Sequence, residues 1–266
     1  MGKMVYIHDD IEDLNSAAAA NIASILMRSF RLRGKANFAL SGGSTSTGVY
    51  KALTHNQYRN SVPWSSVHFF WGDERCVPAE DPESNYRQAY DCLLTAIPVD
   101  HAKIHRIKGE LSPQEAVSDY TKLLSEYSQG DYRWPIFDIA VMGMGEDGHT
   151  ASLFPGMFNP SEDVKPVIPV EAAYQNRPAC RITLTPMVFN ASRNVIFLIA
   201  GEAKAETLQT ALSDQNDPKN IPVQRIQPVT GNIIWHVDLA AAKYLQEQKK
   251  RKGFINLEMK NRDEGN

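Results

Sequence analysis

Short apolar runs alternate with helix-like segments along nearly the whole chain, and this alternation constrains the fold more than any other feature. The runs contain few polar residues, which is typical of strands buried on both faces of a sheet. The candidate strands cover residues 5–8, 36–40, 67–71, 136–142, 181–185 and 194–200. The candidate helices cover 14–33, 48–53, 85–95, 113–127, 202–212 and 239–248. The order predicts an α/β fold, a mostly parallel, doubly wound sheet with helices on both faces.

The chain divides into one large domain and a tail. We expect a single α/β domain over residues 1–248, with 155–178 as an irregular, Pro-rich surface excursion, and a charged C-terminal tail over 249–266. Asp13 is expected to cap the first helix, and Ser112, followed by Pro113, the fourth. Nothing in the sequence fixes the oligomeric state, and we expect a monomer or a weak homodimer.

Charge and apolar content exclude several classes of partner. The formal net charge of −3 favours neither nucleic acid nor an anionic membrane. No apolar run approaches the ~18 residues of a membrane helix, and the first ten residues do not resemble a secretory signal. Three widely spaced cysteines, Cys76, Cys92 and Cys180, are typical of reduced thiols in a cytoplasmic protein rather than of a disulfide framework or a zinc site.

Four polar segments each follow a candidate strand. They cover residues 41–45, 72–75, 143–149 and 201–204. Because the carboxyl ends of parallel strands lie along one edge of a sheet, we expect these segments to meet in one cleft. Their convergence is stronger evidence for a site than any one of them.

The first two segments suit an anion. Gly42 and Gly43 let the backbone approach a ligand, while Ser44 and Thr45 add hydroxyl donors at a helix N-terminus. Taken alone, this segment is equally well explained as a tight turn with a helix cap. In the second segment, Arg75 suits bidentate recognition of phosphate, and Asp73 could accept sugar hydroxyls or orient a proton carrier. A salt-bridged loop explains Glu74 as well.

The third segment, residues 143–148, matches the dinucleotide-binding pattern G-x-G-x-x-G, but its own charges oppose that function. Glu146 and Asp147 would face a pyrophosphate, and Pro155 limits any helix that begins here. Acid–base chemistry explains the segment better. Histidine is the residue type whose unperturbed pKa lies near neutrality, and Asp147 could fix the tautomer of His149.

Two further cations complete the candidate site. Arg181 opens a candidate strand and Lys204 lies where a helix begins, a position at which a cation is favourable only beside an anion. With Arg75, they could neutralise a phosphate. The other histidines show no ligand spacing, so we expect no catalytic metal, and no G-x-S-x-G elbow indicates a serine nucleophile.

These segments together resemble the signatures of the 6-phosphogluconolactonase family. The resemblance rests on residues 41–45, 73–75 with 84–86, 143–155, 181–185 and 201–205, and their order agrees from about Val5 to Leu239. Ser46 departs from the family, which often has proline there. The resemblance implies a fold shared with glucosamine-6-phosphate deaminases and ribose-5-phosphate isomerases. It also implies hydrolysis of 6-phospho-D-glucono-1,5-lactone, in the oxidative pentose phosphate pathway, without a cofactor.

The family pattern also implies a role for each site residue. His149 would act as general base toward water, and Asp147 and Asp73 would position it and the sugar. Arg75, Arg181, Lys204 and residues 43–45 would hold the phosphate. The nearest alternative is an amino-sugar phosphate deaminase on the same scaffold, in which a carboxylate stands in place of Phe154. A sugar-phosphate sensor without catalysis is the second alternative.

Overall fold

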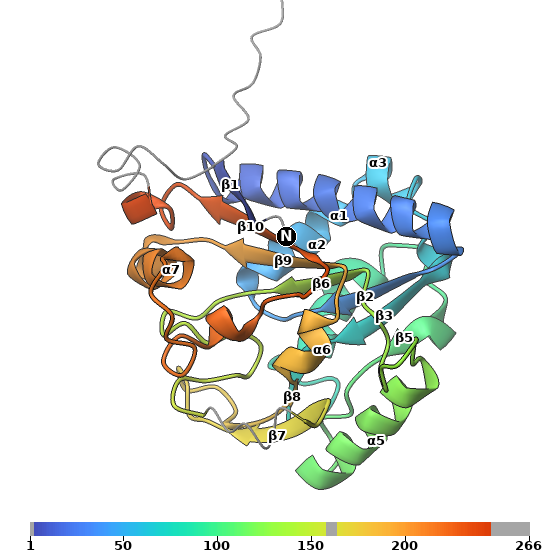
Figure 1. The fold of residues 1–266 in the computed structure, drawn as a ribbon. Coiled ribbons are helices and arrows are strands. Elements are labelled where there is room, and N and C mark those ends of the chain that lie inside the picture. The colour runs from blue at the N-terminus through green and yellow to red at the C-terminus, as the bar shows by residue number, and fades with distance from the viewer. Residues whose placement is uncertain (1–2, 158–163, 246–266) are drawn as a thin grey trace, which may run out of the picture.

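The fold is built on a seven-stranded sheet in which every neighbouring pair is parallel. The computed structural model describes residues 3–157 and 164–245. The strand order is β1-β10-β9-β6-β2-β3-β5 (Figure 1). The bounds are β1 Lys3–His8, β2 Ala36–Leu40, β3 Val67–Trp71, β5 Ile104–His105, β6 Ile139–Met142, β9 Asn194–Ile199 and β10 Asn232–Asp238. The predicted parallel sheet is therefore confirmed, with β5 and β10 as strands that the sequence pattern missed.

A second, three-stranded antiparallel sheet corrects two expectations. It consists of β4 Asp73–Arg75, β8 Cys180–Leu184 and β7 Val167–Glu171, in the order β4-β8-β7. The strand predicted over 181–185 exists, but it belongs to this sheet. The range 155–178, expected to be irregular, contains β7, because Ile168 and Val170 pack on Phe154 from one face of the strand and Val167 packs in the main core from the other.

Gly72 joins the two sheets. Its N–H donates to the carbonyl of Leu40 in β2, and its own carbonyl accepts from the N–H of Leu184 in β8. A Cβ atom on Gly72 would lie 3.2 Å from the ring of Phe189 in the helix after β8, so a larger residue would fit only if this ring moved slightly. The chain thus leaves the parallel sheet at Trp71 and enters the antiparallel one a single residue later.

Helices cover both faces of the main sheet (Figure 1). Their bounds are α1 Ile11–Arg33, α2 Ser44–Leu53, α3 Asn56–Arg59, α4 Asn85–Ala89 continued by a π-turn Tyr90–Leu94, α5 Pro113–Glu126, α6 Pro186–Asn190 and α7 Ala205–Leu212, which follows the 3₁₀ turn Glu202–Lys204. None of the helices in the described ranges is both long and apolar enough to cross a bilayer. The helix predicted over 239–248 begins only at residue 243, and its end, like the tail over 249–266, lies outside the described residues.

The caps of these helices are partly as predicted. Ser112 caps α5 in a capping box with Glu115. Asp10, rather than Asp13, caps α1, accepting from the N–H groups of Glu12 and Asp13. The prediction of Asp13 was wrong because α1 begins three residues earlier than the apolar pattern indicates.

Two buried tyrosines hold the strand ends that lead into the polar segments. The hydroxyl of Tyr50 in α2 accepts from the N–H of Ser41 and donates to its carbonyl, at 2.9 and 3.0 Å. The hydroxyl of Tyr120 in α5 makes the same two bonds to Trp71, both at 3.0 Å. Each tyrosine satisfies backbone groups that the sheet no longer pairs, and so fixes where the following segment starts.

Strand order reverses between β2 and β6. From β2 the chain moves outward to β3 and β5, and then it returns to the other side of β2 with β6. Such a switch point is where open α/β sheets bind ligands, beyond the carboxyl ends of the strands.

Candidate active site

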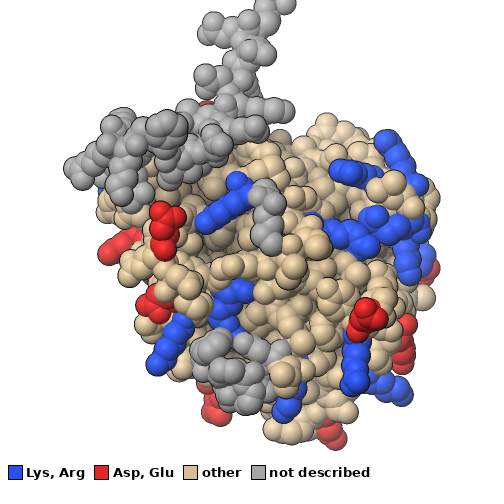
Figure 2. Space-filling model, in the orientation of Figure 1, with Lys and Arg blue, Asp and Glu red and all other residues tan. Residues whose placement is uncertain are grey.

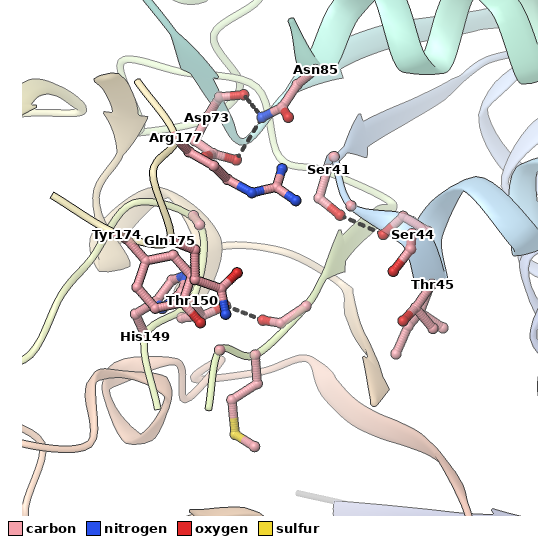
Figure 3. A pocket seen from close by; sticks show the side chains of 18 of the residues that line it. Ser41, Ser44, Thr45, Asp73, Asn85, His149, Thr150, Tyr174, Gln175 and Arg177 are labelled. Atoms are coloured by element: carbon pink, nitrogen blue, oxygen red, sulfur yellow. Dashed lines mark hydrogen bonds between the residues drawn. The ribbon is translucent and has the colours of Figure 1, made fainter. Parts of the chain in front are cut away.

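A cleft of ≈ 300 Å³ lies at this switch point (Figure 3). The segments after β2, β6 and β9 line it, together with residues of β4 and β8. All predicted site residues except Asp147 line the cleft: Gly42, Gly43, Ser44, Thr45, Asp73, Arg75, His149, Arg181 and Lys204. The four polar segments therefore do meet, as their place after the strands predicts.

Asp147 lies behind His149 rather than in the cleft wall. Its Oδ1 is 2.6 Å from Nδ1 of His149, and it also accepts from the His149 N–H at 3.1 Å. Burial alone would raise the pKa of Asp147, but the hydrogen bond to His149 and the charge interaction with it hold that pKa below its ordinary value. An ionised Asp147 requires a proton on Nδ1, which leaves Nε2 of His149 with the lone pair that a base needs.

Two aromatic rings hold the His149 ring from the sides. Phe154 stacks on it with the ring centroids 4.5 Å apart, and Tyr174 meets it edge-on at 4.6 Å. Phe154 is itself anchored against Ile168 and Val170 of β7. The guanidinium of Arg181 lies over the Phe154 ring at 5.2 Å. Phe154 thus contacts both the imidazole, the candidate base, and the guanidinium of Arg181, a candidate phosphate ligand.

Arg75 and Arg181 are directly opposite each other in the register of β4 and β8. Both are buried, with 6% and 2% of their surface exposed. Like charges at such a pair destabilise a sheet. Burial lowers the pKa of Arg181, and although Asp73 opposes this effect, Arg75 adds to it. A bound anion would relieve the repulsion.

Each of these arginines also keeps a donor without a partner. Nε of Arg75 and Nη2 of Arg181 are buried and find no acceptor within the described ranges. One other nitrogen of each side chain is bound: Nη1 of Arg75 donates to the carbonyl of Glu83, and Nε of Arg181 donates to that of Pro178 at 3.2 Å. An unpaired buried donor is costly, so the two atoms indicate a ligand that supplies oxygen acceptors.

The segment after β2 is built for close approach. A Cβ atom on Gly42 would lie 1.8 Å from Oδ1 of Asn85, so a larger residue would displace the Asn85 side chain. Gly43 has φ +102 and precedes the first turn of α2. Its N–H is already bound to Oε1 of Gln88 at 3.0 Å, which corrects the expectation that this amide faces the anion. The next amides, of Ser44 and Thr45, begin α2 and have no acceptor within the helix.

Asp73 and Glu74 fix the wall of the cleft. Asp73 accepts from Ser152 Oγ at 2.7 Å and from Asn85 Nδ2 at 3.3 Å. No hydrogen bond joins it to His149 in the part of the chain that the structure describes. Glu74 is buried and accepts from the backbone N–H groups of Arg75, Asn85 and Tyr86 and from the Ser84 hydroxyl. Burial outweighs these bonds and raises the pKa of Glu74 to about 7.

Lys204 closes the far side, at the start of α7 as predicted. Burial lowers the pKa of Lys204, while the charges of Glu146 and Asp238 oppose the shift. A half-buried ammonium group at a helix N-terminus is stabilised by these two carboxylates, and a bound anion would stabilise it further.

Several cleft residues were not predicted from the sequence. Tyr174, Gln175 and Arg177 belong to the turn between β7 and β8, and Figure 3 shows the Arg177 guanidinium pointing into the cleft. Gln175 and Asn176 both have positive φ, and this tight turn brings Tyr174 back to Arg177. A Gln-Asn pair between two apolar stretches is the one signal that could have indicated it.

The surface of the molecule is not uniformly positive. Basic and acidic side chains both occur on the face drawn in Figure 2, and the net charge of the chain is −3. Attraction for an anion therefore comes from the buried cations of the cleft.

Comparisons with known proteins identify the family of this chain. A family model described as glucosamine-6-phosphate isomerases/6-phosphogluconolactonase matches residues 9–235. The chain is 35% identical to a 6-phosphogluconolactonase of Synechocystis over 80% of its length and 86% of the relative's. It is 34% identical to one of Haemophilus influenzae over 79% and 87% of the two chains.

Solved structures agree as well. The 6-phosphogluconolactonase of Trypanosoma brucei superposes with a TM-score of 0.79 at 26% identity, over 92% of this chain and 99% of that one. A monomeric glucosamine-6-phosphate deaminase, 19% identical, shares the fold with a TM-score of 0.76 over 90% and 99%. The chain belongs to the glucosamine-6-phosphate isomerase/6-phosphogluconolactonase family.

Proposed function

We propose that this protein is a 6-phosphogluconolactonase, which hydrolyses 6-phospho-D-glucono-1,5-lactone to 6-phospho-D-gluconate in the pentose phosphate pathway. The observation that carries the proposal is the pairing of His149 with Asp147 in one cleft with two buried arginines, each of which keeps one donor without an acceptor among the described residues. A base and an anion site in one cleft suit a substrate with a phosphate at one end and an ester carbon at the other. Close relatives named for this activity support the assignment.

The reaction needs one base and no cofactor. Nε2 of His149 takes a proton from a water molecule, and the resulting hydroxide adds to the carbonyl carbon C1 of the lactone. Asp147 stabilises the imidazolium through Nδ1. The tetrahedral intermediate then collapses, the bond from C1 to the ring oxygen breaks, and the imidazolium returns its proton to that oxygen. The sugar acid leaves with its chain open and His149 neutral again.

Phosphate binding holds C1 in place. We assign the phosphate to Arg75 and Arg181, with Lys204 and the first amides and hydroxyls of α2, at Ser44 and Thr45, as further donors. Guanidinium groups bind phosphate oxygens through two parallel bonds, which fix direction as well as position. We assign Asp73, held by Asn85 and Ser152, to a positioning role for the sugar.

An amino-sugar phosphate deaminase is the alternative that the fold allows. Phe154 argues against it, because this ring packs on both His149 and Arg181 where a deaminase has a carboxylate to carry protons. One experiment separates the two activities: acid release from the lactone, formed in place by glucose-6-phosphate oxidation, against ammonia release from glucosamine 6-phosphate. Ammonia release without lactone hydrolysis would overturn the proposal.

We infer that the enzyme works in the cytoplasm without a metal, on a small-molecule substrate. Relatives from rice and Arabidopsis are named chloroplastic, so the compartment needs its own test. Expression of the full chain as a fluorescent fusion at its C-terminus would provide it, with a signal confined to an organelle as the contrary result.

A further inference from the structure

Cys76 and Cys180 lie in contact, although 104 positions separate them in the sequence. Their Sγ atoms are 2.6 Å apart, and the N–H of Cys76 donates to the carbonyl of Cys180 at 3.0 Å. Cys76 follows the last residue of β4, and Cys180 is the first residue of β8. Arg75 precedes Cys76 and Arg181 follows Cys180, and these two arginines are the next pair of opposed residues in the sheet. The odd number and wide spacing of the cysteines in the sequence do not predict this pair.

The backbone around the two thiols fits a covalent bridge. Residues directly opposite each other in an antiparallel pair and joined by hydrogen bonds have Cα atoms about 5.5 Å apart. Disulfides span about 4.4–6.8 Å between Cα atoms, with a sulfur–sulfur bond of about 2.05 Å. Small side-chain rotations therefore suffice to close the bond. Both residues are only partly buried, so a small reagent can reach them.

We propose that Cys76 and Cys180 form a site of reversible disulfide modification, which joins β4 to β8 beside the two arginines of the cleft. The oxidant is a low-molecular-weight disulfide such as oxidised glutathione. One cysteine thiolate attacks a sulfur of the reagent, forms a mixed disulfide and releases one thiol. The second cysteine then attacks the protein sulfur of that mixed disulfide and releases the other. The protein is oxidised by two electrons, and the reagent is reduced to two thiols.

Proton loss limits the rate of this exchange. Burial raises the pKa of Cys76 to about 12, and the contact with Cys180 adds to the shift. Because the thiolate is the attacking species, a raised pKa slows the exchange at neutral pH. The second attack is intramolecular, and its high effective concentration offsets a low thiolate fraction.

The bond would stabilise the region that holds the anion. It closes a loop of about a hundred residues, and a crosslink over such a length lowers the entropy of the unfolded chain strongly. It also fixes the register in which Arg75 and Arg181 face each other. We expect the melting temperature of the oxidised protein to rise by about 5–10 °C.

The test uses the full chain, incubated with oxidised glutathione near pH 8 and then quenched with acid. Free thiols are titrated in denaturant, and peptides are mapped by mass spectrometry without reduction. We expect Cys76 and Cys180 in one crosslinked peptide, with Cys92 as the remaining free thiol. Dithiothreitol should restore all three thiols and the original melting temperature.

Matched variants separate this site from nonspecific oxidation. Cys92→Ser should still form the bond and show the rise in melting temperature, whereas Cys76→Ser and Cys180→Ser should each lose both. Three free thiols after incubation, glutathione adducts alone, or a bridge that includes Cys92 would overturn the site. An unchanged melting temperature with the bond present would overturn its stabilising role. These readouts do not depend on the lactonase activity.

Discussion

Gly145 leaves the space that the ring of His149 occupies. A Cβ atom on Gly145 would lie 2.1 Å from Nδ1 of His149 and 2.6 Å from Oδ1 of Asp147. The loop bends back so tightly that the Gly145 N–H donates to the carbonyl of His149 at 2.8 Å. A glycine at this position is therefore a condition for the pairing of the imidazole with the carboxylate.

Gly145→Ala should lower kcat on the order of 100-fold, because the methyl group displaces the base or its partner. Steady-state kinetics with the lactone would measure this, and KM should change by less than about threefold since the arginines stay in place. Gly143→Ala is the matched control in the same loop, because a Cβ atom there meets no atom within 4 Å. Equal losses in the two variants would contradict the argument.

His149→Ala should lower kcat by on the order of 100-fold or more, the usual loss when general-base assistance is removed. The lactone also hydrolyses without enzyme, so rates must be corrected for that background. His55→Ala changes an exposed histidine away from the cleft and should leave kcat within about twofold. Turnover near that of the wild type in His149→Ala would remove the role assigned to the imidazole.

Arg181→Ala should raise KM and the inhibition constant of inorganic phosphate by roughly 10- to 100-fold, the range for a lost charge-assisted hydrogen bond. Arg181→Lys keeps the positive charge but loses the two parallel N–H donors. Its KM and its inhibition constant for phosphate should therefore lie between those of the wild type and of Arg181→Ala. Arg59→Ala, a change at an exposed residue, controls for the loss of one positive charge. Phosphate inhibition unchanged in Arg181→Ala would show that this side chain does not bind the anion.

Glu74 should make folding stability depend on pH. Its pKa of about 7 in the folded protein exceeds its ordinary value of 4.5, so the folded state binds the proton more tightly. The stabilisation is complete below about pH 4.5 and is lost as the pH rises through about 7. The full effect is on the order of 3 kcal/mol.

Urea unfolding of the wild type and of Glu74→Gln at several pH values from 5 to 8 would measure this contribution. The variant is expected to be less stable at low pH, because an amide N–H would face the donors that bind Oε2 of Glu74. The advantage of the wild type should shrink as the pH rises. Parallel curves for the two proteins would contradict the raised pKa.

The parallel sheet and most of the site could be predicted from the sequence for one physical reason. Strands buried on both faces must be apolar throughout, so they are visible as runs, and polar residues directly after them stand at the ligand edge. β10 was not predicted because His236 and Asp238 interrupt its run of apolar residues. His236 is buried through a bond of 2.9 Å to His8 of β1, a partner that no local pattern reveals.

What could not be predicted depends on contacts between distant segments. Arg181 was found, but its place in a second sheet, opposite Arg75, was not, because an isolated strand does not reveal its partner. Tyr174 and Arg177 reach the cleft only because β7 and β8 pair and their turn folds over His149. The pairing of β4 with β8 brings Cys180 to Cys76.

The packing of the two sheets at Gly72 sets the distance between the base and the arginines, and therefore the length of substrate that the cleft accepts. His149 follows a strand of the parallel sheet, whereas Arg75 and Arg181 belong to the antiparallel sheet. The distance between them therefore depends on how the two sheets pack at Gly72, where Phe189 makes contact. Selection for activity on sugar phosphates one carbon shorter or longer should therefore favour substitutions at this buried contact between the sheets. Substitutions of the residues that touch the ligand should be selected less often.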